Sequence, residues 1–461
     1  MMESEEIVKR TVGIEVLKSW MVSEGCEISQ KIGYFEGEKG VGGIVAKEEI
    51  GPGEVLALIK KDVILSTELL EGSELERIFL CYPDFFGKEN PEGQDNQFLT
   101  LVLYEKQKKS LSKYRHFFRT LPDTIETLTD WSSSDSIELQ DPDLSSDLPI
   151  RTQKNLSSYT YLHKILQNFP HFFPIPISIR EIEWCWRIIS TRCFMRSPQH
   201  SALIPFADLF NHGESSTGFY FIDQNENSEN FSEDFDEILT VDSVVELSCQ
   251  DLLEINFSVY GFDGSREGEG LGEVFDMLRI EAQSAQRVLD GGKGKGSVED
   301  KGKGSDFVVV VGSKQKYEAG DEVLIEYGGY SNTSLLLHYG FSMLNNRHET
   351  FRLKIKMSEF ITNEQATSLP LKFDKNAFLV FHVSGKELSR ELLRCLRAIE
   401  WRPVNKKTSF FSQSDLGLER KVLEKYLVFL NLALGKFETS ILQDRCSKAL
   451  NRRNKFAVKF I

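Results

Sequence analysis

The chain has 461 residues, of which 40% are hydrophobic and 11% aromatic, and its formal net charge is −15. This apolar content is typical of a folded globular protein, and the length allows two or three domains or one domain with large insertions. The negative charge argues against direct nucleic-acid binding, which needs a basic face, and favours a basic partner.

The seven cysteines are scattered, and no two of them have the C-x-x-C spacing. This argues against a zinc ribbon and against a disulfide framework, so we expect reduced thiols. The N-terminal MMESEEIVKR is charged and no apolar run follows it, so no secretory signal is expected. No segment approaches the ~18 apolar residues that a membrane span needs.

In chain order, the first expected element is a helix over residues 12–23, where apolar residues recur at helical spacing. Residues 31–66 change to short β-like runs, GGIVAKEEI and EVLALIKKDVIL, with a G-P-G break at 51–53. Residues 67–177 then have a mainly helical pattern. Within them, a Ser- and Asp-rich stretch at 130–149 predicts a solvated loop.

The next expected element is a helix that begins at a capping box, because Ser178 and Glu181 form the S-x-x-E pattern. Apolar residues then recur at helical spacing as far as Cys193 and predict a buried stripe. Arg192 lies near the end of this helix. A cation there offsets the negative end of the helix dipole, so Arg192 taken alone needs no further role.

Two polar segments follow. Residues 223–237 carry seven acidic and no basic side chains, and residues 290–305 are of low complexity and predict a flexible loop. Two strand-like runs then flank an A-G-D turn at 319–321. The last part has one β-like run, FRLKIKM, followed by helical segments at 388–400 and 418–434.

The stretch ALIPFADLFNHGES, residues 202–215, allows three interpretations. Asp208 and His212 could ligate a metal from one helical face, but no third ligand has a suitable spacing and Pro205 disfavours a continuous helix. A hydrolytic triad lacks the G-x-S-x-G elbow. The third interpretation is a corner that holds a ligand, for which Asn211 and His212 offer donors and acceptors.

Four segments become informative when they are read together. They are GVGGIVAKEEIGPGEVL (40–56), STRCF (190–194), IPFADLFNH (204–212) and GDEVLIEYGGYSNTSLLLHYGF (320–341). In this order they resemble the motifs of the SET-domain protein methyltransferases. The resemblance is closest to the branch that contains the Rubisco large-subunit methyltransferase and the fungal ribosomal-protein lysine methyltransferases. Each motif alone is modest, but the ordered set is specific.

The resemblance implies an α+β fold. A small, knot-like, β-rich SET domain is split by a helical insertion and followed by an all-helical C-terminal lobe. The implied domains are a SET catalytic domain over 1–345 and a helical substrate-binding domain over 346–461. The helical insertion then covers about 67–177, and an acidic, low-complexity insertion covers about 223–305.

The cofactor of this family is S-adenosyl-L-methionine (SAM). The residues that the resemblance assigns to it are Gly40, Val41, Gly42, Gly43, Arg192, Asn211, His212 and Phe341. The glycines would let the backbone approach the cofactor, and Arg192 would pair with its carboxylate. Asn211 and His212 would hold its amino-acid and adenine portions, and Phe341 would lie against the adenine.

Tyr327 matches the catalytic tyrosine of the family, whose hydroxyl and nearby carbonyls orient the acceptor amine and the methyl group. Without the flanking motif, a buried tyrosine in a strand would be an ordinary core residue. Asp208 and Tyr339 match positions that line the acceptor channel. We expect Tyr330 to be a surface or loop residue and the Ser331-Asn332 pair to start the following helix.

The implied function is a SAM-dependent protein-lysine N-methyltransferase acting on a basic protein, with a ribosomal protein favoured over a histone. The acidic run at 223–237 could steer such a substrate, although a solvated insertion explains it equally well. A protein-histidine methyltransferase of the same fold and a catalytically silent SET-like binding module stay open as alternatives. We expect a monomer of the cytoplasm or nucleus, with no metal site, no membrane contact and no direct nucleic-acid contact.

Overall fold

The computed structural model describes most of the N-terminal part of the chain and separate segments beyond it. The described residues are 2–36, 42–132, 135–136, 139, 142–197, 200–222, 306–356, 378–384, 388–389, 392–393, 396 and 416–435. Several predicted features lie outside them: Gly40, Val41, the acidic run 223–237, the low-complexity run 290–305 and most of the predicted helix 388–400.

A four-stranded antiparallel sheet, in the order β1-β4-β10-β9, joins segments from both ends of the N-terminal part. Its strands are β1 (Glu27–Ile28), β4 (Val55–Ile59), β10 (Asp306–Val310) and β9 (Gly218–Ile222). All five residues of β10 are buried, as expected for a central strand with the apolar sequence FVVV. Ile222 pairs with Asp306, so the chain leaves and re-enters this sheet at neighbouring positions.

Smaller β elements complete the predicted β-rich region. They are the hairpin of β2 (Ile32–Glu36) and β3 (Gly42–Ala46), the sheet of β5 (Leu65–Ser66), β7 (His200–Leu203) and β6 (Cys193–Ser197), and the parallel pair of β8 (Asn211–His212) and β11 (Leu324–Ile325). The β-like runs predicted within 31–66 are therefore confirmed as β2 to β5.

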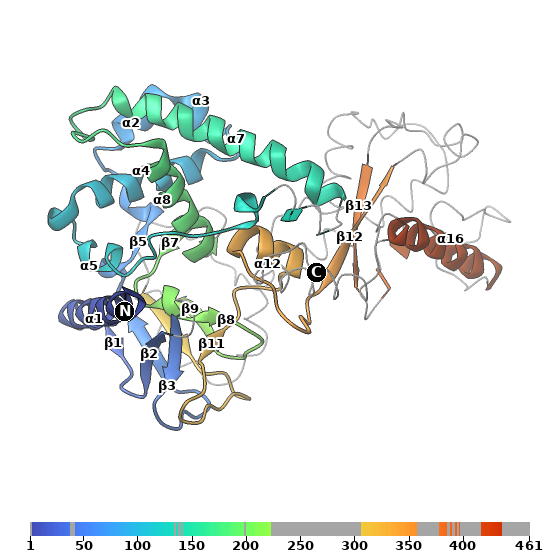
Figure 1. Cartoon of the computed structure of the whole chain (residues 1–461), viewed down its shortest axis with the longest axis horizontal. Helices are drawn as coiled ribbons and strands as arrows, with labels where there is room; N and C mark the ends of the chain where they lie inside the picture. Colours follow the sequence, from blue (N-terminus) through green and yellow to red (C-terminus); the bar gives the residue numbers. More distant parts are fainter. Residues whose placement is uncertain are drawn as a thin grey trace, which may run out of the picture.

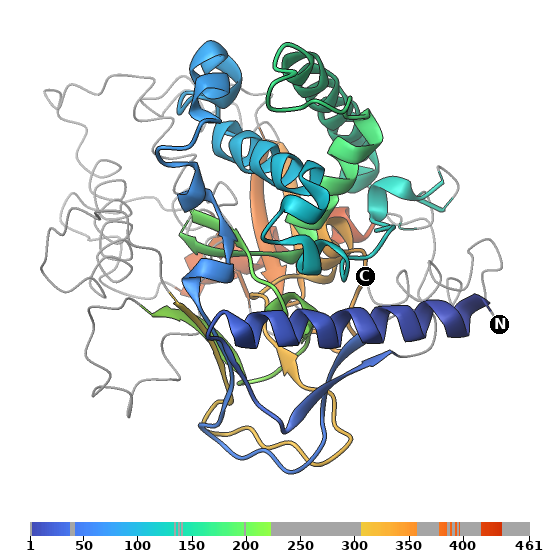
Figure 2. The ribbon, with the colours of Figure 1, turned by 90° about the vertical axis from the view of Figure 1, so that its left-hand side faces the viewer.

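The helical block predicted over 67–177 is also confirmed. Its helices are α2 (Glu76–Cys81), α3 (Pro83–Phe86), α4 (Gly93–Gln107), α5 (Arg115–Phe118) and α7 (Pro142–Gln167). They lie above the β2–β3 hairpin in Figure 1. The first helix, α1 (Met2–Ser23), crosses between these helices and the hairpin, as Figure 2 shows, and contacts both α5 and β2.

The loop predicted at 130–149 is wrong in its second half, because α7 begins at Pro142. Proline is well tolerated at the first position of a helix. Leu144 and Leu148 are both buried, and their i, i+4 spacing places them on one face of α7. The Ser- and Asp-rich composition around them hides this short apolar stripe in the sequence.

Helix starts follow the predicted capping patterns. α8 (Ile179–Arg192) begins where the Ser178 N–H donates to Glu181 Oε2 at 2.9 Å and the Glu181 N–H donates to Ser178 Oγ at 3.2 Å. α12 (Asn332–Tyr339) begins at Ser331, whose hydroxyl accepts a backbone hydrogen bond from the first turn. It ends at Gly340, whose φ of 79° is left-handed.

The C-terminal part needs a correction, because it is not all-helical. β12 (Thr350–Lys356) pairs antiparallel with β13 (Phe378–Ser384), beside α16 (Leu416–Leu434), as seen in Figure 1. The predicted run FRLKIKM is β12, whereas β13, with the sequence FLVFHVS, has no counterpart in the predicted elements. Aromatic and β-branched residues favour a strand there. The α+β class itself is confirmed.

Four phenylalanine rings hold β6, β9 and β10 together. The centroid of the Phe307 ring lies 5.2 Å from that of Phe194, 5.4 Å from Phe219 and 5.2 Å from Phe221. The Phe307 side chain is fully buried. Because its three neighbours precede residues 223–305 and Phe307 follows them, Phe307 joins the two halves of the β-rich region.

We expect Phe307→Ala to lower the free energy of unfolding by about 3–5 kcal/mol, because it leaves a cavity among three rings. Chemical denaturation followed by circular dichroism measures this change. Leu80→Ala, at a position that is 80% exposed, is the matched control and should change stability by less than about 0.5 kcal/mol. Equal effects of the two substitutions would contradict the central place of Phe307.

Candidate active site

Two segments that are far apart in the sequence meet as a short pair of parallel strands. In the β8–β11 pair, Asn211 lies opposite Leu324 and His212 lies opposite Ile325 (Figure 1). The turn before β8, residues 207–209, is buried. The polar corner and the tyrosine segment, which the family resemblance assigned to one site, therefore lie side by side.

The Asn211 side chain joins the glycine hairpin to the tyrosine segment. Its Nδ2 donates to the Gly42 carbonyl oxygen at 3.1 Å and to Glu322 Oε1 at 2.7 Å. A Cβ on Gly43 would lie 2.6 Å from Asn211 Nδ2, and a Cβ on Gly42 would lie 1.9 Å from the Tyr34 hydroxyl oxygen. A larger residue at either position would have to displace these side chains, so the two glycines allow the close packing of the site.

The His212 ring is a partly buried, neutral acceptor. Its Nδ1 accepts the Tyr327 backbone N–H at 3.0 Å, which fixes the tautomer with its proton on Nε2. Burial lowers the pKa of His212 to about 4, although the Glu326 carboxylate acts in the opposite direction. The imidazole is therefore uncharged at physiological pH.

The Tyr327 side chain is partly buried against the core, and its hydroxyl donates to the Phe210 carbonyl oxygen at 2.7 Å. Burial raises the pKa of Tyr327 to about 12, with the positive charge of Arg192 acting against this rise and the negative charge of Asp208 adding to it. The phenol keeps its proton at neutral pH. It can therefore orient a reacting group, but it cannot act as a general base there.

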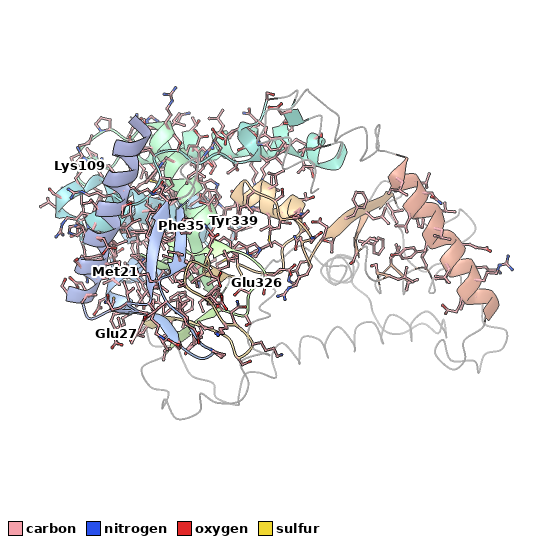
Figure 3. The ribbon with its side chains drawn as sticks, turned by 60° about the horizontal axis from the view of Figure 1, so that its bottom comes forward. Met21, Glu27, Phe35, Lys109, Glu326 and Tyr339 are labelled. Atoms are coloured by element: carbon pink, nitrogen blue, oxygen red, sulfur yellow. The ribbon has the colours of Figure 1, made fainter. Side chains whose placement is uncertain are left out.

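Aromatic rings from β8, α12 and the residues after α12 surround Tyr327. Ring centroids are separated by 5.0 Å between His212 and Tyr327 and by 5.3 Å between Tyr327 and Tyr339. The Phe341 ring is 6.0 Å from His212 and 6.1 Å from Tyr339, which projects from the end of α12 (Figure 3). Tyr330 is a loop residue, as predicted, but its ring packs 5.7 Å from Tyr339.

Arg192 and Asp208 form an ion pair inside the site. Arg192 Nη1 donates to Asp208 Oδ2 at 2.8 Å and to the Asp208 main-chain oxygen at 2.9 Å. The Asp208 side chain is 1% exposed, and burial raises the pKa of its carboxyl group while Arg192 opposes that rise. Asp208 Oδ1 has no hydrogen-bond partner among the described residues. One buried acceptor is thus left for a donor from a ligand or substrate.

Two acidic residues of the site, Glu322 and Glu326, were missed by sequence reasoning. Glu322 binds Asn211, and Glu326 contacts His348 Nε2 at 2.8 Å and Arg347 Nη2 at 2.5 Å. The run E-V-L-I-E carries a signal that could have revealed them. Its apolar residues Val323 and Ile325 are buried, so the strand alternation places both glutamates on the opposite face.

The described residues offer neither a metal cluster nor a membrane-spanning helix. The described part of the chain contains no group of three or more His, Cys, Asp or Glu side chains that could hold a metal ion. No helix within the described residues is long and apolar enough to cross a membrane. The candidate active site is the cluster around Tyr327, where the glycine hairpin, the polar corner and the tyrosine segment meet.

Acid should destabilise the protein through His212. Its folded pKa of about 4 lies below the ordinary value of 6.5, so the unfolded chain binds the proton more tightly. The stabilisation is complete above pH 6.5 and is lost as the pH falls towards 4, by on the order of 1–3 kcal/mol. His212→Asn keeps an acceptor oxygen near the position of Nδ1 but does not titrate. Its stability should fall less steeply in this window, and identical slopes would contradict the assignment.

No protein-family model matches the chain, but three curated proteins match part of it. It is 23% identical over 207 residues to the Rubisco large subunit N-methyltransferase of Nicotiana tabacum, covering 44% of this chain and 40% of that protein. It is 28% identical over 172 residues to the [fructose-bisphosphate aldolase]-lysine N-methyltransferase of Arabidopsis thaliana, covering 37% of this chain and 33% of that protein. The matches thus span less than half the length of these curated relatives.

Solved structures resemble the chain over most of its length. The SET domain of LSMT bound to lysine and AdoHcy gives a TM-score of 0.58 at 18% identity, covering 97% of this chain and 87% of that one. Rubisco LSMT bound to AdoMet gives a TM-score of 0.56 at 17% identity, covering 97% of this chain and 88% of that one. The fold of this chain is therefore that of the SET-domain structures, as the four sequence motifs implied.

Proposed function

We propose that the protein is a SAM-dependent protein-lysine N-methyltransferase. The observation that carries this proposal is the convergence of three motif segments on one buried site. Asn211 binds the Gly42 carbonyl, and His212 binds the backbone of Tyr327. The shared fold supports the proposal, as do partial relatives that are named N-methyltransferases of proteins.

The groups present in the site fit SAM. Asp208 Oδ1 is a buried acceptor without a partner among the described residues, which suits an amine donor. The Arg192 guanidinium carries several donors and can bind a carboxylate besides the one it already holds. Gly42 and Gly43 allow close approach of the backbone, and Phe341 offers an apolar face to the adenine.

When bound, the cofactor supplies a methyl group on a positively charged sulfur. The Tyr327 hydroxyl and the Phe210 carbonyl, already joined at 2.7 Å, would orient the acceptor amine towards it. Tyr327 keeps its proton, so the amine has to arrive neutral, and removal from water beside aromatic rings lowers an amine's pKa. Positioning in a dry channel then supplies much of the rate.

The proposed substrate is a basic protein, and a ribosomal protein is the narrower candidate. The net charge of −15 favours a basic partner. The two curated relatives act, by their names, on Rubisco and on fructose-bisphosphate aldolase, so a protein acceptor is common to both. The resemblance of the motifs to fungal ribosomal-protein enzymes favours the ribosomal class, and with it a cytoplasmic or nuclear site of action.

Labelling identifies the substrate and tests the proposal. The purified chain is incubated with radiolabelled SAM and a lysate of cells that lack this protein, and the labelled residue is identified by mass spectrometry. Labelled lysine supports the proposal, whereas labelled histidine replaces it with the histidine alternative. No labelling, together with no gain of the about 2.7 kcal/mol that a ligand at 100-fold its Kd provides, would favour the silent binding module.

Tyr327→Phe should lower kcat by about 10²- to 10³-fold, because it removes the hydroxyl oxygen that would orient the reacting groups. The Kd for SAM, measured by calorimetry, should stay within about twofold of wild type. Tyr161→Phe, at a tyrosine that is 46% exposed on α7, is the matched control and should keep full activity. Full turnover in Tyr327→Phe would remove the proposed catalytic role.

Asn211→Ala should affect binding and folding together. The substitution removes two hydrogen bonds that join the Gly42 hairpin to Glu322, which lowers the free energy of unfolding by about 1–3 kcal/mol. The Kd for SAM should rise about tenfold or more, because the glycine backbone is no longer held at the site. Unchanged SAM affinity would place the cofactor elsewhere.

A further inference from the structure

One segment of the helical insertion contacts both helices that end at the candidate site. This segment, residues 125–131, is called the strut below. α8 ends at Arg192 and α12 ends at Tyr339, and α12 contacts both α8 and the 3-10 turn of the strut, η5 (Leu128–Asp130). None of the roles proposed above involves the strut.

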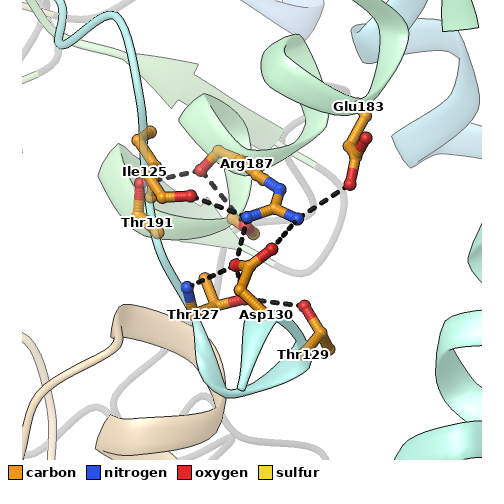
Figure 4. Close-up of polar contacts among 8 residues, drawn as sticks. Ile125, Thr127, Thr129, Asp130, Glu183, Arg187 and Thr191 are labelled. Atoms are coloured by element: carbon orange, nitrogen blue, oxygen red, sulfur yellow. Dashed lines mark hydrogen bonds and ion pairs between the residues drawn. The ribbon is translucent and has the colours of Figure 1, made fainter. Parts of the chain in front are cut away.

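Arg187 on α8 binds the strut through hydrogen bonds of its planar guanidinium group (Figure 4). Nη1 donates to the Ile125 carbonyl oxygen at 2.7 Å and also binds Asp130 Oδ2. Nη2 donates to Asp130 Oδ1 and to Glu183 Oε1, both at 2.7 Å. Asp130 Oδ2 also accepts the Thr127 N–H at 2.8 Å, which closes the capping box of η5.

Arg187 and Asp130 form an ion pair whose side chains are partly shielded from water. The Arg187 side chain is 18% exposed and the Asp130 side chain 31%. Burial alone would raise the pKa of Asp130, but hydrogen bonds from Arg187 and Thr127 hold that pKa below its ordinary value. The hydrogen bond to Asp130 raises the pKa of Arg187. A lysine cannot reproduce this arrangement, because it lacks the planar guanidinium group whose two Nη atoms donate to several acceptors at once.

The strut touches the last turn of α12 through its backbone. A Cβ on Gly340 would lie 2.3 Å from the Glu126 carbonyl oxygen, so no side chain fits between them. The left-handed φ of 79° at Gly340 also favours glycine. This contact falls between Tyr339 and Phe341, and both of those rings belong to the aromatic cluster of the site.

An apolar contact joins the strut to the middle of α12. Leu128 of η5 is 1% exposed and packs in one cluster with Leu336 of α12, which is fully buried. Leu139 and, on α7, Leu144 and Leu148 belong to the same cluster. The strut is therefore fixed by ionic contacts on the α8 side and by close packing on the α12 side.

We propose that Arg187 is a positioning residue for the reaction. Through the strut it fixes the turn Tyr339-Gly340-Phe341, and thereby the width of the acceptor channel and the aromatic contact with the cofactor. The inference rests on the proposed function and extends it to the helical insertion. Because α8 also carries Arg192, the contact of Arg187 with the strut also keeps the end of α8 at a fixed distance from the end of α12.

Arg187→Met in the full chain tests the proposal, since methionine keeps the length of the side chain without the guanidinium group. At a temperature where circular dichroism shows the variant folded, kcat should fall and the Kd for SAM should rise, each about tenfold or more. Lys60→Met is the matched control. It breaks the Lys60–Asp306 ion pair of 2.9 Å between the end of β4 and β10, and should keep wild-type kcat and Kd.

A double variant separates positioning from a general loss of stability. If Arg187 acts through the turn, Arg187→Met should raise the Kd for SAM about tenfold in the wild-type chain but less than about twofold in Phe341→Ala, where the contact is already lost. The same tenfold rise in both backgrounds would overturn the proposal, as would wild-type kcat and Kd in Arg187→Met. A wild-type chain that neither binds SAM nor transfers methyl groups would instead refute the proposed function itself.

Discussion

The hydrogen bond from the Tyr327 backbone to His212 Nδ1 is the contact on which the site depends. It links the polar corner to the tyrosine segment beyond the two parallel strands β8 and β11. It also requires a neutral imidazole, because a protonated Nδ1 could not accept. The burial that depresses the pKa of His212 therefore maintains the geometry of the site. With the backbone of Tyr327 fixed, its hydroxyl reaches the Phe210 carbonyl.

The electrostatics of the site follow from the same exclusion of water. Tyr327 and His212 are held uncharged, and the buried charges of Arg192 and Asp208 neutralise each other. Removing one partner of such a pair leaves an uncompensated buried charge, which is strongly unfavourable. A site of this kind can accept a charged ligand only by rearranging that pair or by adding a compensating charge. A zwitterionic amino-acid group brings both signs and satisfies this condition.

Local signals in the sequence predicted much of the fold, whereas the site residues were assigned by the family resemblance. The capping box at Ser178, the strand FRLKIKM and the helix over 418–434 could be predicted because each depends on neighbouring residues. The contact between Arg192 and Asp208 could not be predicted, because the family resemblance assigned both residues to the site without showing that they bind each other. The strut was missed because its contacts are long-range: Arg187 and Asp130 are 57 residues apart in the sequence, and Leu128 packs against Leu336.

The pairing of Ile222 with Asp306 gives the chain an unusual freedom in length. Ile222 and Asp306, which flank residues 223–305, lie opposite each other in one antiparallel ladder, so the sheet holds the two flanking positions together. The entropy of closing such a loop grows slowly, by about 0.6 kcal/mol for each doubling of its length. Evolution can therefore lengthen, shorten or replace the segment at small thermodynamic cost, while the ladder beside it keeps its register.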